Sequence, residues 1–77
     1  MVYPNPTKGV INLHLLEKPA TAYRVQVSDM YGRIIYSKNI SAEEQNLTID
    51  LEGNVTGVYF LHLYHETKNT VKKIILK

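Results

Sequence analysis

The chain has 77 residues, 44% of them hydrophobic, and this length fits one small globular domain with a single core. Its net charge is only +2, and outside the C-terminus its basic residues are scattered, which argues against a nucleic-acid-binding surface. The sequence contains no cysteine, no apolar run long enough for a membrane helix and no classical signal peptide at its start. A disulfide framework, a Cys-bound metal and membrane insertion are therefore not expected.

Apolar side chains recur at alternate positions through most of the chain, as expected for β-strands that bury one face. In chain order we predict strands at residues 10–16, 23–28, 33–39, 46–51, 58–65 and 70–76. Turn residues separate these segments, among them Lys18-Pro19, Gly53-Asn54 and Lys68-Asn69. The longest helix that we expect is a single turn at residues 41–45. The pattern indicates an all-β fold, a small antiparallel β-sandwich of six to seven strands with a solvent-exposed outer face.

The alternation also predicts which side chains lie inside the sandwich. Positions that share the inward phase on four of the strands should form one core, namely Leu13, Val25, Ile49, Tyr59, Leu61 and Leu63. On the strand at 23–28, Arg24, Gln26 and Ser28 take the opposite phase and should face outward. On the strand at 33–39 the inward face is undefined, because Ile34 and Ile35 are adjacent.

The tetrad Asp29-Met30-Tyr31-Gly32, followed by Arg33, lies between two of these strands and has the composition of a tight turn. An Asp that opens a type I turn can accept a hydrogen bond from a backbone N–H further along the turn. A Gly three residues later can take the positive φ that a hairpin with a β-bulge requires. We therefore predict a tight β-hairpin at this point of the chain.

The side chains that usually carry catalysis or bind metals form no recognisable constellation. Glu43 and Glu44 are adjacent in a polar loop, where no cleft would desolvate one of them for acid–base chemistry. His62 and His65 should point to opposite faces of their strand, so a zinc site would need His14 to meet His62 across strands, with a third ligand nearby. Three surface histidines are the simpler interpretation. We predict no catalytic residue, no metal site and no cofactor.

Tyrosine is the one enriched aromatic residue, with six copies against one Phe and no Trp. On the strand at 58–65, Phe60, His62 and Tyr64 share the phase opposite to the core. This stripe has two interpretations. It is either an exposed contact surface, or it is covered because the strand is central or packs against a loop.

Four short marks follow one another along the chain. They are Tyr3-Pro4-Asn5-Pro6 with Gly9, the run VQVSDMYGR at residues 25–33, Gly57-Val58-Tyr59-Phe60-Leu61, and Lys73-Ile74-Ile75-Leu76-Lys77. In this order and at this spacing they cover nearly the whole chain, which resembles the type A C-terminal sorting domain of the type IX (Por) secretion system of Bacteroidetes. The residues that match the family motif are Pro4, Asn5, Pro6, Gly9, Asp29, Gly32, Arg33, Gly57 and Tyr59.

The resemblance implies an immunoglobulin-like sandwich that acts as an address label and not as an enzyme. Residues 1–77 would then be a single sorting domain, and the opening Met1-Val2-Tyr3-Pro4 looks like the start of a domain excised from a larger cargo protein. That cargo, which can itself be an enzyme, would cross the inner membrane and pass through the periplasm. The outer-membrane secretion machinery would carry it to the cell surface or the medium, and a sortase-like protease would normally remove the domain. The implied partners are these proteins and the cargo in cis, whereas the oligomeric state stays open.

The terminal strand contains a candidate recognition end, in which Lys72, Lys73 and Lys77 bracket Ile74-Ile75-Leu76. A strand of this kind often lies at a sheet edge, where lysines discourage unwanted pairing. The functional alternative is that the machinery reads this end. The lysines would then meet an acidic partner surface, and the free edge would accept an added strand.

On the residues alone, a second class of function stays open. The chain could be a carbohydrate- or protein-binding accessory module of a secreted protein, with its tyrosines as the ligand platform. A small enzyme is not supported, because no acid, base, nucleophile or set of metal ligands converges.

Overall fold

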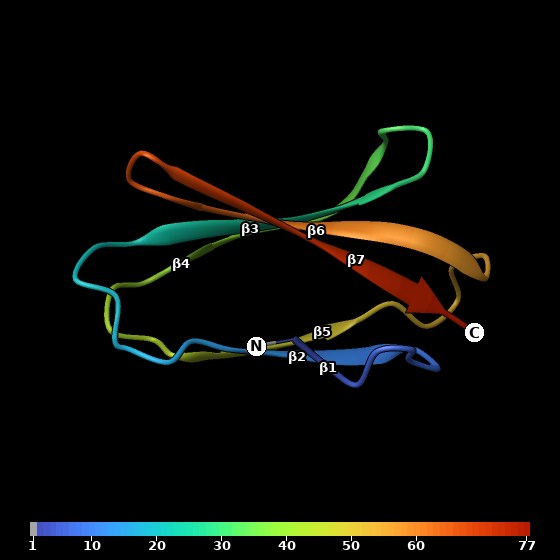
Figure 1. Cartoon of the computed structure of the whole chain (residues 1–77), viewed down its shortest axis with the longest axis horizontal. Coiled ribbons are helices and arrows are strands. Elements are labelled where there is room, and N and C mark those ends of the chain that lie inside the picture. The colour runs from blue at the N-terminus through green and yellow to red at the C-terminus, as the bar shows by residue number, and fades with distance from the viewer. Residues whose placement is uncertain (1) are drawn as a thin grey trace.

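The computed structural model describes residues 2–77, which form seven strands in two antiparallel sheets. The strands are β1 (Val2–Tyr3), β2 (Val10–His14), β3 (Tyr23–Asp29), β4 (Ile34–Ile40), β5 (Asn46–Asp50), β6 (Gly57–His65) and β7 (Lys68–Leu76). One sheet has the order β1-β2-β5 and the other the order β4-β3-β6-β7, and the two face each other as the layers of a sandwich (Figure 1). The described residues include no helix that could span a bilayer. The predicted all-β, immunoglobulin-like sandwich is confirmed.

All six predicted strands are present, and each of their ends lies within two residues of the predicted position. The additional strand, β1, pairs Val2 with Leu13 and Tyr3 with Asn12. The expected helical turn at residues 41–45 was wrong. The chain makes a non-helical turn there, in which Glu43 has a positive φ of 73° that an α-helix does not allow.

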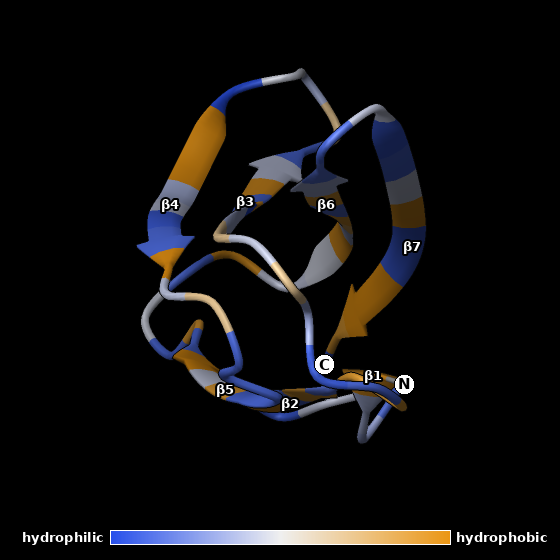
Figure 2. Cartoon of the chain, turned by 90° about the vertical axis from the view of Figure 1, so that its left-hand side faces the viewer, coloured by the Kyte–Doolittle hydropathy of each residue, from blue (hydrophilic) through white to orange (hydrophobic). Residues whose placement is uncertain are grey.

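The core lies between the two sheets and consists of the side chains with the inward phase. Its buried members are Ile11, Leu13, Tyr23, Val25, Val27, Ile40, Leu47, Ile49, Leu51, Tyr59, Leu61, Ile74 and Leu76. Leu63 is half-buried and packs against this cluster. The predicted core set is therefore confirmed, with Leu63 at its margin. Figure 2 shows the four-stranded sheet curving over β2 and β5.

The inward face of β4, which the sequence left undefined, is set by a β-bulge. In the pairing of β3 with β4, Val27 lies opposite Tyr36 while the next residue, Ser28, lies opposite Ile34, so that Ile35 is the extra residue. Tyr36 packs against the core, whereas Ile34 and Ile35 stay exposed. The bulge lets the chain place two adjacent isoleucines without burying either.

Ser28 corrects one detail of the predicted outer face. Its phase is outward as expected, but the residue is buried, with 7% of its surface exposed. Phe60 and Ile34 lie opposite it on the two neighbouring strands, and its Oγ is 3.1 Å from Nε2 of His62. The larger neighbours cover this small side chain, and alternation alone cannot reveal such covering.

An N-terminal strap, residues 5–7, joins the two sheets along one side of the sandwich. Thr7 forms a parallel bridge with Leu76 at the end of β7, where its N–H donates to the carbonyl of Ile75 and its carbonyl accepts from the N–H of Lys77. The Asn5 side chain donates to the carbonyl of Lys73 at 2.8 Å and accepts from the N–H of Ile75 at 3.0 Å. The strap therefore covers the terminal part of the β7 edge.

Candidate functional site

The β3–β4 hairpin is held by the Asp29 carboxylate. Its Oδ1 accepts hydrogen bonds from the backbone N–H groups of Tyr31 and Arg33, both at 2.9 Å. Its Oδ2 accepts from Nε of Arg33 at 2.7 Å, which makes this contact an ion pair as well. The N–H of Gly32 donates to the Asp29 carbonyl, and Gly32 has a φ of 83°. The predicted hairpin is thereby confirmed, with Asp29 and Gly32 in the expected structural roles.

A branched side chain at Gly32 should strain this turn. No atom lies within 4 Å of a Cβ built there, so the cost of Gly32→Val comes from the positive φ and not from crowding. We expect the free energy of unfolding to fall by about 1 kcal/mol or more, measured by urea denaturation. Tyr31→Val, at an exposed neighbour without a positive φ, is the control and should change it by about 0.5 kcal/mol or less. Equal effects of the two substitutions would contradict the prediction.

The Asp29 carboxyl has a pKa below its ordinary value of 3.8. Burial alone would raise this pKa, but the hydrogen bonds from Arg33 and Tyr31, together with the Arg33 charge, outweigh that effect. A carboxyl whose pKa is depressed by folding stabilises the fold fully above its unfolded pKa. This contribution is lost as the pH falls through the lower, folded pKa.

Stability of the domain should therefore decline in acid partly through Asp29. We expect the Asp29→Asn variant to lose less free energy of unfolding than the parent between pH about 7 and about 2.5, because Asn carries no proton to take up. Urea denaturation of both proteins across this range measures the difference. Parallel stability curves for the two proteins would show that Asp29 does not contribute to the acid dependence.

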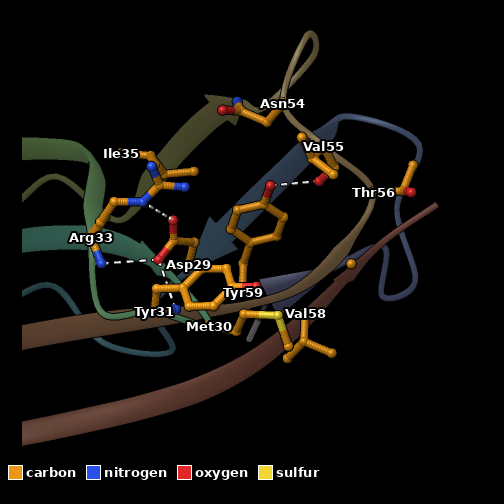
Figure 3. A pocket seen from close by; sticks show the side chains of 11 residues that line it. Asp29, Met30, Tyr31, Arg33, Ile35, Asn54, Val55, Thr56, Val58 and Tyr59 are labelled. Carbon is orange, nitrogen blue, oxygen red and sulfur yellow. Dashed lines mark hydrogen bonds and ion pairs between the residues drawn. The ribbon is translucent and has the colours of Figure 1, made fainter.

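The structure brings the hairpin next to the start of β6. Asp29 and Tyr59 are directly opposite each other on β3 and β6, and the Tyr59 hydroxyl donates to the carbonyl of Val55 at 2.5 Å. Gly57 begins β6 with a φ of 149°, a conformation that favours glycine. An open hollow of about 190 Å³ lies between the hairpin and residues 54–59 (Figure 3).

The remaining motif residues lie at the strap and at the end of β7. Both the Tyr3–Pro4 and the Asn5–Pro6 peptide bonds are cis. Gly9 follows the strap, and its carbonyl accepts a hydrogen bond from the N–H of Leu51. On β7, Ile74 lies opposite Tyr59 and Leu76 lies opposite Gly57. The four separated sequence marks therefore meet at one end of the sandwich, where β3, β6, β7 and the strap lie side by side (Figure 1).

The candidate recognition end has a definite geometry. β7 is an outer strand of its sheet, and Lys72, Lys73 and Lys77 are all exposed. Four backbone groups that point away from β6 form hydrogen bonds with the strap. They are the carbonyls of Lys73 and Ile75 and the N–H groups of Ile75 and Lys77. A strand added at this edge would consequently have to pair with β7 before Lys73, unless the strap were displaced.

The stripe of Phe60, His62 and Tyr64 is half-buried on the outer face of the four-stranded sheet. The His62 and Tyr64 rings stack with centroids 6.0 Å apart, and the Arg24 guanidinium lies 5.0 Å from the centre of the Tyr64 ring. The strand is central, as one interpretation required, but its outer aromatic side chains are covered by each other and by neighbours on the sheet.

The histidines do not converge. His62 lies on the outer face, whereas His65 approaches Thr21 at 3.0 Å and the buried Tyr23 ring, so the predicted opposite facing is confirmed. His14 lies on the other sheet, where its Nδ1 is 2.6 Å from the Asn46 side-chain oxygen. Within residues 2–77, no group of three or more His, Cys, Asp or Glu residues is placed to hold a metal ion.

At the end of the sandwich where the four sequence marks meet, the structure shows two features that were not predicted. One is the double hydrogen bond by which Asn5 holds the β7 edge, for which the sequence carries no local signal. The other is the exposure of Met30, Tyr31 and Val55. The signal in the sequence is their position at turns, where large apolar side chains are usually exposed.

The chain is similar to a known protein family over its whole length. The family model described as the secretion system C-terminal sorting domain matches residues 1–77, the whole chain. No curated protein matches the chain closely enough to count as a relative. Because the match spans every part of the fold, the chain belongs to the family of C-terminal sorting domains of the type IX secretion system.

Proposed function

We propose that residues 1–77 act as the address label of a larger exported protein and lie in its C-terminal part. The cargo crosses the inner membrane, passes through the periplasm and is carried across the outer membrane once the machinery has bound the folded label. A sortase-like protease then removes the label. The observation that carries this proposal is the family match over the whole chain. It favours the label over a carbohydrate- or protein-binding accessory module.

The fold suits such a label physically. The domain is stabilised by one closed core and by a strap that joins its sheets, and its sequence has no cysteine that could form a disulfide. Recognition of its shape therefore depends little on the redox state or on the cargo that precedes it. We further propose that the machinery reads the end of β7, through the exposed lysines and the uncovered stretch of the edge.

The test is a reporter that carries an inner-membrane export signal and is fused upstream of residues 1–77, expressed in a bacterium with a type IX system. We expect the reporter at the cell surface or in the medium. The same reporter without the domain should stay in the periplasm, as should the fusion in a strain that lacks the machinery. Equal distribution of the fused and unfused reporters would contradict the proposed label.

Removal of the label has a separate readout. A delivered reporter that has lost the domain should be smaller than the intact fusion by the domain's 8.8 kDa. Delivery of an uncut fusion would contradict the proteolytic step while leaving the export function intact.

A further inference from the structure

Exposed apolar side chains gather at the hairpin end of the molecule. In residues 2–77, nine large hydrophobic residues are exposed, and five of them lie on the hairpin and the neighbouring loop. These five are Met30, Tyr31, Ile34, Ile35 and Val55. Tyr31 and Val55 have 80% and 81% of their surface exposed. Two short segments thus contain more than half of the exposed apolar side chains, which marks this end as a contact surface.

Arg33 adds a fixed cation to this end. Its Nε is held by Asp29, yet the side chain is 77% exposed. Its two Nη groups form no hydrogen bond with any residue in the described part of the chain, 2–77. Both oxygens of Asp29 are already used by the turn and by Nε. The guanidinium is therefore pre-oriented, with its outer donors available to a ligand.

The surroundings favour an acidic ligand at these donors. Residues 30–42 and 53–65, which contain the exposed segments, have no acidic side chain, whereas Arg33 and Lys38 are both cationic. A carboxylate at the Arg33 Nη groups would form charge-assisted hydrogen bonds without a competing anion on these segments. Apolar side chains beside it could enter the hollow lined by Tyr31, Val55 and Val58 (Figure 3).

We propose that this hairpin-end surface, made of Met30, Tyr31, Arg33, Val55 and Val58, binds an extended segment of a protein of the type IX machinery. The bound segment carries one acidic side chain, which meets Arg33, between apolar side chains, which meet the hollow. Tyr, Met and Arg are the residue types enriched at protein interfaces, and Tyr and Arg often dominate their energetics. The inference rests on the proposed sorting function and adds a second contact to the end of β7.

The reporter fusion tests this surface with two combined variants. The first, Met30→Ser/Tyr31→Ser/Val55→Ser, removes the apolar contacts. The second, Asp29→Asn/Arg33→Gln, removes the cation and keeps the net charge at +2. We expect each to lower delivery to the surface by about tenfold or more, as loss of an interface hot spot does.

Controls match each variant at sites away from this surface. Leu16→Ser removes an apolar side chain that is 84% exposed at the opposite end, and Arg24→Gln removes an exposed cation. Both should be delivered like the parent. Melting temperatures of the purified domains establish that each variant is folded. If the triple variant unfolds, Tyr31→Ser alone takes its place, since that side chain is 80% exposed and should be removable without unfolding. If the charge-neutral variant unfolds, Arg33→Gln alone takes its place, since that side chain is exposed as well.

Each outcome has one meaning. Normal delivery of the folded triple variant, or of Tyr31→Ser where it replaces that variant, would overturn the proposal. Loss of delivery in the triple variant but not in the charge-neutral variant would overturn the acidic character of the partner. A parent domain that dimerises through Tyr31 in solution, with delivery unaffected by Tyr31→Ser, would assign the surface to a second copy and overturn the proposal. Failure of the parent fusion itself would instead refute the sorting function on which the inference rests.

Discussion

Replacing Tyr59 with alanine should lower the free energy of unfolding by about 3–5 kcal/mol, the usual cost of removing a large aromatic side chain from a core. The Tyr59 ring is 6% exposed, and its strand neighbours Asp29 and Ile74 lie directly opposite it. Its loss would leave a cavity next to the hairpin and would release the hydroxyl bond that holds Val55. A domain of this size has little stability to spare, so the variant should be largely unfolded at 37 °C.

Tyr59→Phe separates the two contributions. It keeps the ring in the core and removes only the hydrogen bond to the Val55 carbonyl, so it should cost about 1 kcal/mol. Urea denaturation and the melting temperature of both variants measure these effects. An alanine variant that melts at the parent's temperature would show that the ring does not contribute to the core as described.

Four of the strands, β2, β3, β5 and β6, could be predicted because each has one buried face and one more exposed face. On β2, β3, β5 and β6 the inward residues alternate strictly, and the structure buries or half-buries all of those predicted. The short β1 could not be predicted, since two residues between a terminus and a proline carry no alternation. Its existence depends on β2, which supplies the partner backbone.

The alternation of the sequence does not predict features that depend on how the strands pair in the folded domain. The phase of β4 depends on a bulge at Ile35, and the sequence does not show where a register shifts. The burial of Ser28 depends on which neighbours flank it, and this follows from the strand order β4-β3-β6. Both features follow from strand pairing, namely the irregular register between β3 and β4 and the pairing of β3 with β6, which is distant in the sequence.

In the candidate site, too, the local features could be predicted from the sequence and the long-range contacts could not. The Asp29 and Gly32 roles are local, because all the hydrogen bonds of the turn lie within five consecutive residues, and they could be predicted. The meeting of the hairpin, the start of β6, the end of β7 and the strap is not local. It requires β6 to pair with β3 on one side and β7 on the other, and the strap to return across the chain to residues 73–77.

These contacts also connect the two surfaces proposed for recognition. β6 lies between the hairpin and β7, so Tyr59 touches the strand that carries Asp29 and the strand that carries the lysines. A defect in the Tyr59 core should therefore damage both surfaces together. Substitutions of exposed side chains at either surface should leave the other intact, and this distinction makes delivery assays on folded variants informative.

Reversal of three lysines at the end of β7 should abolish delivery while the domain stays folded. Lys72 and Lys73 lie opposite Leu61 and Phe60, so their side chains point to opposite faces and are reached together only from the edge of the sheet. Each exposed Lys→Glu change should alter the free energy of unfolding by about 0.5 kcal/mol or less. On the side of the C-terminal strand, the hydrogen bonds of the strap use only backbone groups of residues 73–77, so they should survive.

The Lys72→Glu/Lys73→Glu/Lys77→Glu variant changes the net charge from +2 to −4, because each reversal removes two units. Lys8→Glu/Lys18→Glu/Arg24→Glu reaches the same net charge from exposed cations outside β7 and outside the hairpin-end surface, and it is the matched control. If an acidic partner reads the β7 end, the first fusion accumulates in the periplasm and the control reaches the surface. If lysines only protect the edge from unwanted pairing, both folded variants are delivered, and the charged end is then not the recognised feature.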